Sequence, residues 1–203
     1  MYRVNDVFFT LQGEGRHMGI PAVFVRFSGC NLSCPWCDTS FKEFTLQTAE
    51  QIVEKVLNLY PVSPSIDNKQ LVSRQKKWVV LTGGEPSLQV DFSLVEALHQ
   101  AGFRVAIETN GTHFLPSNID WITCSPKANS HVVLTAANEV KVVYTPEEDN
   151  NPEQWYNTIA AQHYLLQPLE QNNKTNIQDT LAYIFANPHW QLSVQLHKIL
   201  GFK

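Results

Sequence analysis

Three cysteines lie close together in the sequence, at positions 30, 34 and 37 within the segment CNLSCPWC. Clustered thiolates hold zinc or iron–sulfur centres. A structural zinc site requires a fourth Cys or His at short range, and none follows until His99. Ferredoxin spacing differs as well, because two residues separate its cysteines. Three thiolates favour a four-iron cluster that keeps one iron open for a ligand. A zinc site and scattered core thiols are the alternatives.

A second segment that could bind a ligand is TGGEP, at residues 82–86. Gly83 and Gly84 lack side chains, which lets a ligand approach the backbone closely. Glu85 supplies a carboxylate where the amine of a ligand would lie. When the segment is taken alone, a tight turn is the alternative.

Length and composition predict one soluble domain over residues 1–203, since 43% of the residues are apolar and 17% are charged. No apolar run approaches the length of a membrane helix, and the first residues lack the apolar core of a signal peptide. We therefore expect a cytoplasmic protein without a membrane partner, with cysteines that bind metal in a reducing compartment. The net charge of −4 argues against nucleic acid as a partner and favours a small-molecule substrate.

Strand-like and helix-like segments alternate along the chain, which predicts an α/β fold with parallel strands and crossover helices. At 203 residues the chain is shorter than the roughly 250 residues of a closed eight-unit barrel. We expect a partial, open TIM-type barrel with reduced helices. The predicted strands cover residues 22–28, 78–82, 104–108, 121–123, 139–143, 163–166 and 192–195. The predicted helices cover residues 48–59, 91–101, 153–161 and 176–186.

Polar segments follow the predicted strands. In barrels of this kind the site is built where the strands end, at their carboxyl ends. We therefore expect six loops to meet at one mouth. These loops are residues 29–39, 82–86, 108–111, 125–127, 167–170 and 195–198.

The cysteine spacing, with an aromatic residue before the third cysteine, resembles the cluster loop of radical S-adenosylmethionine (SAM) enzymes, and TGGEP resembles their segment for the SAM amino group. This resemblance implies a radical SAM fold and a 4Fe–4S cluster on Cys30, Cys34 and Cys37. It also implies that SAM binds the open iron. The implied SAM-binding residues are Trp36, Cys37, Asp38, Gly83, Gly84, Glu85, Ser125, Pro126, Lys127, Gln167, Pro168, Leu169 and Glu170.

The segment FTLQGEG at residues 9–15, together with Arg26 and Asp38-Thr39, resembles the 7-carboxy-7-deazaguanine synthases of the queuosine pathway of tRNA modification. This resemblance covers nearly the whole chain. It implies a homodimeric lyase that converts 6-carboxy-5,6,7,8-tetrahydropterin to 7-carboxy-7-deazaguanine with loss of ammonia. A radical formed from SAM would take the hydrogen on C6 of the pterin, and SAM would be regenerated. The electron donor would be a flavodoxin or ferredoxin.

The same resemblance assigns Mg²⁺ to the Thr39 hydroxyl and the pterin carboxylate to the guanidinium of Arg26. Relatives often carry Gln-Thr-His where this chain has Gln195-Leu196-His197, and residues 60–77 contain no recognised motif. The implied substrate-binding residues are Gln12, Gly13, Glu14, Arg26, Thr82, Gln195 and His197.

Two other functions remain open at this point. A glycyl-radical activating enzyme shares the three-cysteine loop but acts on a protein. A zinc-binding module would have no enzymatic activity. Cys124 is expected to be a small buried residue rather than a fourth cluster ligand, because a fourth thiolate would block the open iron. The alternative for Arg26 is a salt bridge on the surface of a strand, which would contribute little to stability.

Overall fold

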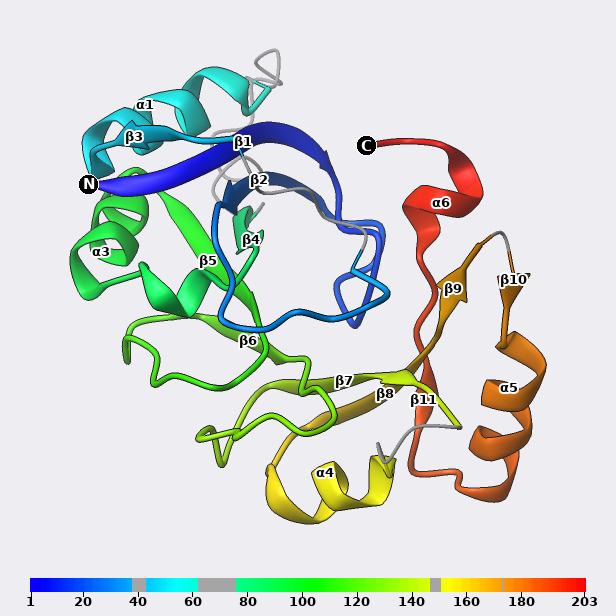
Figure 1. Cartoon of the computed structure of the whole chain (residues 1–203). Helices are drawn as coiled ribbons and strands as arrows, with labels where there is room; N and C mark the ends of the chain where they lie inside the picture. The colour runs from blue at the N-terminus through cyan, green and yellow to red at the C-terminus, as the bar shows by residue number, and fades with distance from the viewer. Residues whose placement is uncertain (38–42, 62–75, 147–150, 173) are drawn as a thin grey trace.

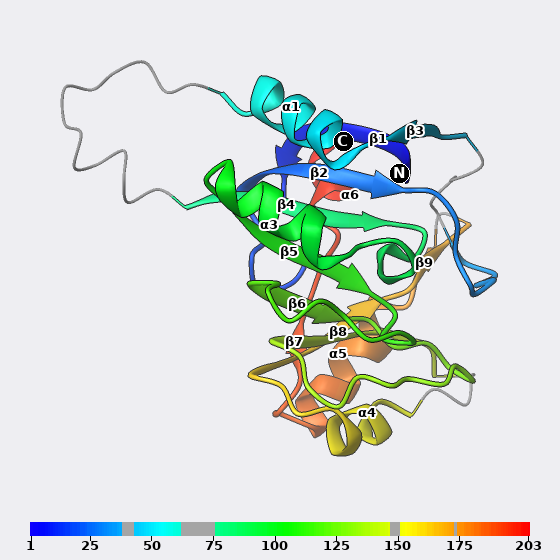
Figure 2. The same ribbon diagram turned by 90° about the vertical axis from the view of Figure 1, so that its left-hand side faces the viewer.

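The computed structural model describes residues 1–37, 43–61, 76–146, 151–172 and 174–203, and its main feature is a curved sheet of nine strands. From β11 to β2 every neighbouring pair is parallel, whereas β1 is antiparallel to β2 and to β3. The arrowheads of β2, β4 and β5 point the same way (Figure 2). The strands in sheet order are β11 (Gln191–Leu192), β8 (His163–Pro168), β7 (Glu139–Tyr144), β6 (Trp121–Cys124), β5 (Phe103–Thr109), β4 (Lys77–Gly83), β2 (Pro21–Phe27), β1 (Tyr2–Leu11) and β3 (Thr45–Gln47).

The sheet is not closed, because β11 and β3 are its two edges. Helix α6 (Leu196–Leu200) and the residues after it lie beside the opening (Figure 1). The backbone N–H of Leu196 donates to the carbonyl of Gly13 at 2.9 Å, and the Thr10 hydroxyl donates to the carbonyl of Lys203 at 2.6 Å. These contacts join the C-terminal segment to β1 and to the loop that follows it. The partial, open barrel expected from the sequence is confirmed.

Helices cover the outer face of the sheet, and α1, α3 and α4 begin at side chains that cap the free backbone N–H groups. Thr48 and Gln51 form a capping box at the start of α1, as the sequence predicted. The Asp91 carboxylate accepts from the backbone N–H of Leu94 at the start of α3. The helical elements are α1 (Ala49–Leu59), the 3₁₀ turn η1 (Pro86–Leu88), α3 (Phe92–Gln100), α4 (Pro152–Thr158) and α5 (Ile177–Ala186); the short strands β9 (Glu170–Gln171) and β10 (Lys174–Thr175) form a hairpin.

Successive side chains of a strand point to opposite faces, and the two faces of this sheet differ in chemistry. On the outer face, the valines, leucine and isoleucine of β2, β4 and β5 pack against α1 and α3. On the inner face, an apolar layer at the amino ends of the strands includes Ala22, Trp78 and Ala106, with Trp121 packed against it. The ring centroid of His17 lies 4.7 Å from that of Trp78 and 4.2 Å from that of Trp121. The amino-terminal end of the barrel is therefore filled.

Several predicted boundaries are wrong. The strand expected over residues 192–195 ends at Leu192, because Gln195 becomes the N-cap of α6. The helix expected to reach residue 161 ends at Thr158, since Ala160 forms a bridge with Ala136. Strands β1 and β3 were not predicted. In the described part of the chain, the helices are too short or too polar to cross a membrane.

Candidate active site

The cysteine loop follows β2 at the carboxyl ends of the parallel strands. Cys30 and Cys34 are half-buried, Cys37 is exposed, and all three line one cavity of about 260 Å³. The backbone N–H of Cys37 donates to the carbonyl of Cys34 at 3.1 Å, and that of Leu32 donates to the Cys30 sulfur at 3.4 Å. Burial raises the pKa of the Cys30 thiol, so a cation is needed to hold it as a thiolate.

The described residues include no group of three His, Cys, Asp or Glu side chains arranged around a single metal ion. A four-iron cluster does not need that arrangement, because each thiolate binds a different iron and the sulfurs lie further apart. Three cysteines on one cavity wall therefore fit a 4Fe–4S cluster better than a zinc ion.

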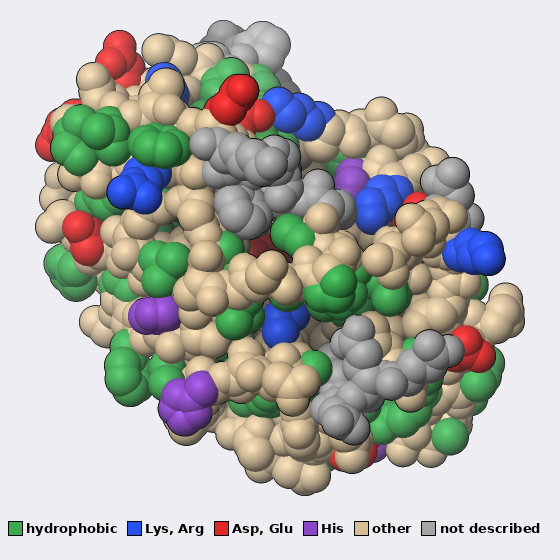
Figure 3. Space-filling model, viewed as in Figure 1, with side chains coloured by type: hydrophobic (Ala, Val, Ile, Leu, Met, Phe, Trp, Pro, Cys, Tyr) green, Lys and Arg blue, Asp and Glu red, His purple; other side chains and the backbone are tan. Residues whose placement is uncertain are grey.

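Most of the predicted SAM-binding residues meet in this same cavity. Pro126 is buried and is not among the lining residues, and Asp38 lies outside the described residues. An acidic and a basic side chain are visible in recesses near the middle of this face (Figure 3). The predicted residues that line the cavity are Trp36, Cys37, Gly83, Gly84, Glu85, Ser125, Lys127, Gln167, Pro168, Leu169 and Glu170.

Glu85 is held in one orientation at the end of β4, where only 1% of its surface is exposed. Its carboxylate accepts from the Thr109 hydroxyl at 2.6 Å, from the Asn110 backbone N–H at 2.7 Å and from the Ser87 backbone N–H at 3.0 Å. A carboxylate has about four acceptor positions. These three donors leave room for one more, such as a ligand amine.

Gly83 and Gly84 line the cavity and also allow the cysteine loop to pack closely against the end of β4. A Cβ atom on Gly84 would lie 2.0 Å from the carbonyl oxygen of Gly29, and one on Gly83 would lie 2.2 Å from that of Phe27. The backbone N–H of Gly84 donates to the Phe27 carbonyl at 2.9 Å, and that of Glu85 donates to the Gly29 carbonyl at 2.8 Å. The glycines thus make room for the start of the cysteine loop, rather than only for a ligand.

Lys127 places an ammonium group beside the cysteine loop. Its Nζ donates to the carbonyl and to the hydroxyl of Ser125, both at 2.6 Å, and lies 5.5 Å from the ring centroid of Trp36. Burial lowers the pKa of Lys127. A ligand carboxylate in this cavity would find a cation here.

A second cavity of about 460 Å³ adjoins the first. Glu14, Thr82 and Glu108 line both cavities and therefore form part of the wall between them. Every predicted substrate-binding residue lines this second cavity, namely Gln12, Gly13, Glu14, Arg26, Thr82, Gln195 and His197.

Arg26 and Thr82 are register partners on β2 and β4, so their side chains lie next to each other on the inner face. Arg26 is half-buried, and its Cζ lies 5.2 Å from the ring centroid of Phe8. This arrangement differs from the alternative of a salt bridge on the surface of a strand.

The loop between β1 and β2 carries Gln12 and Glu14, and main-chain contacts fix its position. The Gln12 N–H donates to the carbonyl of Ile20 at 2.8 Å, and the Arg16 N–H donates to the Glu139 carboxylate at 2.8 Å. Gly15 has a φ of +70°, and a Cβ there would lie 2.2 Å from Glu139 Oε1. A glycine is required at this position for both reasons.

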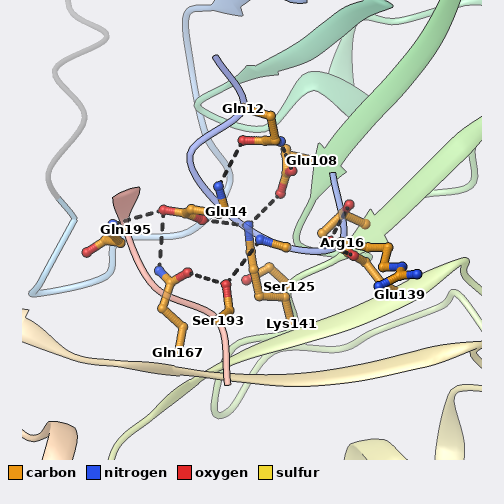
Figure 4. A network of polar contacts seen from close by, with 12 residues as sticks. Gln12, Glu14, Arg16, Glu108, Ser125, Glu139, Lys141, Gln167, Ser193 and Gln195 are labelled. Carbon is orange, nitrogen blue, oxygen red and sulfur yellow. Dashed lines mark hydrogen bonds and ion pairs between the residues drawn. The ribbon is translucent and has the colours of Figure 1, made fainter. Parts of the chain in front are cut away.

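Lys141 of β7 lies at the centre of a polar network that joins this loop to the sheet (Figure 4). Its Nζ is 2.6 Å from Glu14 Oε2 and 2.9 Å from Glu108 Oε2. The Gln12 side-chain amide donates to Glu108 Oε1 at 2.9 Å, and that of Gln195 donates to Glu14 Oε1 at 2.9 Å. The two carboxylates are thus linked through one ammonium group.

The two carboxylates differ in acidity. Burial opposes the ionisation of Glu14, but the Lys141 ammonium and the hydrogen bonds from Lys141 and Gln195 lower its pKa to about 2. For Glu108, burial outweighs Lys141, and the charges of Glu139 and Glu14 add to it, so that its pKa rises to about 7. Burial would lower the pKa of Lys141, but the carboxylates around it raise it overall.

Comparisons with known proteins agree with this geometry. The radical SAM superfamily model matches residues 24–140. The 7-carboxy-7-deazaguanine synthase of Bacteroides thetaiotaomicron is 43% identical, with both chains covered completely, and that of Bradyrhizobium diazoefficiens is 39% identical over 100% of this chain and 99% of its own.

The chain belongs to the radical SAM superfamily and, within it, to the 7-carboxy-7-deazaguanine synthase family. The crystal structure of QueE from Escherichia coli has a TM-score of 0.73 and 28% identity, and it covers 97% of this chain and 94% of that one. Radical SAM enzymes carry a 4Fe–4S cluster and SAM, which fits the three cysteines and the cavity beside them. The zinc module is therefore no longer a candidate.

Two charged residues at the site of this synthase family member have no role predicted from the sequence: Glu108, which lines both cavities, and Lys141, which lines the first. The sequence predicts that Glu108 ends a strand and that Lys141 lies within one, and no motif assigns either of them a role at the site. One signal was available: Glu139 and Lys141 lie two residues apart in a strand with valines, so they share a face of a strand expected to be buried. Buried charges need partners. Thr39, the predicted Mg²⁺ ligand, lies outside the described residues.

Proposed function

We propose that this chain is a 7-carboxy-7-deazaguanine synthase. It is a radical SAM lyase that converts 6-carboxy-5,6,7,8-tetrahydropterin into 7-carboxy-7-deazaguanine with loss of ammonia, in queuosine biosynthesis. One observation carries the proposal: the predicted substrate residues line a single cavity that shares a wall with the cavity of the cysteine loop. A substrate in the second cavity would therefore lie next to SAM in the first.

The cluster and SAM, when bound, supply the one-electron chemistry that removes a hydrogen atom from the substrate. The thiolates of Cys30, Cys34 and Cys37 would hold the cluster. The remaining acceptor position of Glu85 would take the SAM amine, and the Lys127 ammonium would face the SAM carboxylate.

The residues of the second cavity suit a carboxylated pterin. Arg26 offers two parallel N–H donors to the carboxylate, and an ionised carboxylate removed from water requires such a partner. Glu14 and Gln12 offer a carboxylate and an amide to the amino and amide groups on the opposite edge of the ring. The apolar layer of Trp78 and Trp121 fills the barrel at its amino-terminal end and excludes water from that side.

Other parts of the proposal rest on the family alone. We propose that the Thr39 hydroxyl, the substrate and water molecules bind Mg²⁺, because this ion prefers oxygen ligands and keeps several waters. We also propose a homodimer, reduction by a flavodoxin or ferredoxin, and the cytoplasm as the location. Thr39→Ala should lower turnover or change the metal requirement.

The test is anaerobic turnover with reconstituted enzyme, SAM, a reductant and 6-carboxytetrahydropterin, with the product identified by mass spectrometry. The expected product is 7-carboxy-7-deazaguanine, and a Cys34→Ala variant should yield none. A glycyl-radical activating enzyme would instead return the pterin unchanged and cleave SAM only in the presence of a peptide substrate.

A further inference from the structure

Glu14, Lys141 and Glu108 form a buried charge cluster in which one ammonium group lies between two carboxylates (Figure 4). Lys141 is 5% exposed, and the exposed fractions of the Glu14 and Glu108 side chains are 19% and 18%. Glu14 and Glu108 line both cavities, whereas Lys141 lines the first. Lys141 can therefore affect a ligand in the second cavity through the two carboxylates.

The charges around this cluster do not balance. Glu14 comes from the β1–β2 loop, Glu108 from β5, and Glu139 and Lys141 from β7; His197 of α6 also lies near Glu14. Within this cluster one ammonium thus faces three carboxylates. Among the described residues, the other cations that line the two cavities are Lys127, Arg26 of β2, Lys198 of α6 and Lys203. Excess negative charge in a buried site is costly, and binding a proton is the cheapest way to remove it.

The hydrogen bonds indicate which of the two wall carboxylates binds that proton. Glu14 accepts from three side chains: Lys141 at 2.6 Å, Gln195 at 2.9 Å and Gln167 at 3.4 Å. Glu108 accepts from two, Lys141 at 2.9 Å and Gln12 at 2.9 Å. The carboxylate that accepts more hydrogen bonds keeps its charge, so the proton belongs to Glu108.

We propose that Lys141 is a positioning residue for the substrate: it holds Glu14 as an ionised acceptor on the wall between the cavities and orients Glu108 beside it, while burial and the neighbouring carboxylates keep Glu108 a protonated donor. This inference rests on the proposed function for the identity of the substrate. Glu14 then accepts N–H groups of the pterin, while Glu108 donates to a ring acceptor. A second ionised carboxylate at that position would repel an acceptor.

The pH dependence of catalysis follows from this arrangement. Glu108 has a pKa of about 7, so it loses its proton, and the site loses a donor, as the pH rises above neutral. We expect kcat/KM to fall on the alkaline side. Glu108→Gln supplies an N–H donor that does not titrate, so its kcat/KM, taken relative to its own value at pH 6, should show no alkaline fall.

Lys141→Met tests the positioning role itself. Without the ammonium, Glu14 loses its main stabilising charge and Glu108 becomes less acidic. KM for the carboxypterin should rise by roughly tenfold or more, with a smaller change in kcat, and the alkaline fall should move to higher pH. The matched control is Lys77→Met, because Lys77 is an exposed lysine on β4 of the same sheet that lines neither cavity. It should behave as the wild type.

An infrared difference spectrum of the reconstituted enzyme gives a readout that needs no turnover. The band of a protonated carboxylic acid should be present in the wild type at pH 6, disappear between pH 6 and 8.5, and be absent from Glu108→Gln. An unchanged alkaline fall in Glu108→Gln, or the same carboxylic acid band in both proteins, would overturn the inference. If the wild type does not convert the carboxypterin, the proposed function fails, whereas the infrared result still decides the protonation of Glu108.

Discussion

The ammonium of Lys141 lies 2.6 Å from a carboxylate oxygen of Glu14, although 127 residues separate them in the sequence. Lys141 belongs to a parallel strand of the barrel, and Glu14 belongs to the loop after β1, which is antiparallel to its neighbours. Their ion pair, together with the hydrogen bond from Arg16 to Glu139, fixes that loop against the sheet. The loop that carries the synthase motif is therefore positioned by residues of β7.

Mutation should distinguish the three cysteines of the loop, which bind the cluster, from Cys124, which does not. Any of Cys30→Ala, Cys34→Ala or Cys37→Ala should abolish the visible iron–sulfur absorbance after anaerobic reconstitution. Cys124 is fully buried, and burial raises the pKa of its thiol to about 12, so it is a poor metal ligand. Cys124→Ala should keep both the absorbance and SAM cleavage, and loss of the cluster in that variant would contradict the three-ligand assignment.

Gly84→Ala should damage the cluster as well as SAM binding. The new Cβ would lie 2.0 Å from the Gly29 carbonyl, so the start of the cysteine loop must move. The control is Gly102→Ala, where φ is +85° and nothing lies within 4 Å of the new Cβ. It should cost about 1 kcal/mol of stability through the backbone alone and leave the cluster unchanged. Full iron and sulfide content in Gly84→Ala would show that the segments after β2 and β4 are not packed as described.

Arg26→Gln should weaken substrate binding by roughly 30-fold or more, about 2 kcal/mol, because the pterin carboxylate loses its cation. SAM binding should be retained. Arg104→Gln is the matched control, since Arg104 lies on β5 of the same sheet with its Cζ 5.9 Å from the ring centroid of Trp78, and it lines neither cavity. Equilibrium binding of 6-carboxypterin to both variants checks the assignment, which fails if they bind it equally well.

The protonation of Glu108 should also appear in the stability of the protein. Its pKa is about 7 in the folded state and near 4.5 when unfolded, so the folded state binds the extra proton between these values. The free energy of unfolding should therefore decrease on the order of 2 kcal/mol as the pH rises from 5 to 8. Glu14 has a lowered pKa of about 2, and its contribution is lost only as the pH falls below about 4.5.

Urea unfolding of the wild type and of Glu108→Gln at pH 5 and pH 8 measures this difference. The amide does not titrate, so the variant should show a smaller decrease in stability over the same range. An equal decrease in both proteins would assign the pH dependence to another group.

The cysteine loop and the motif residues could be predicted from the sequence because each lies in a short contiguous segment. The spacing of the cysteines in residues 30–37 can be read without knowing the fold. The same is true of the polar residues that follow each predicted strand. Helix α1 was also predicted, with its capping box at Thr48 and Gln51, since both depend on neighbouring residues.

Strand β1 and the partners of Lys141 could not be predicted in this way. In β1, buried and exposed positions do not alternate regularly, because its pairing with β2 is irregular between Val4 and Asp6. The contact of Lys141 with Glu108 spans 33 residues, and its contact with Glu14 spans 127. Such contacts follow from the order of the strands in the sheet, which no local pattern specifies.

The most direct test of the proposed synthase site uses 6-carboxytetrahydropterin that carries deuterium at C6. If the two cavities hold SAM and the pterin side by side, as their shared wall implies, deuterium should move from C6 of the substrate to the 5′-carbon of SAM during anaerobic turnover. Mass spectrometry should then find deuterated SAM together with 7-carboxy-7-deazaguanine. Undeuterated SAM, with the pterin returned unchanged while another substrate supports SAM cleavage, would contradict the synthase assignment.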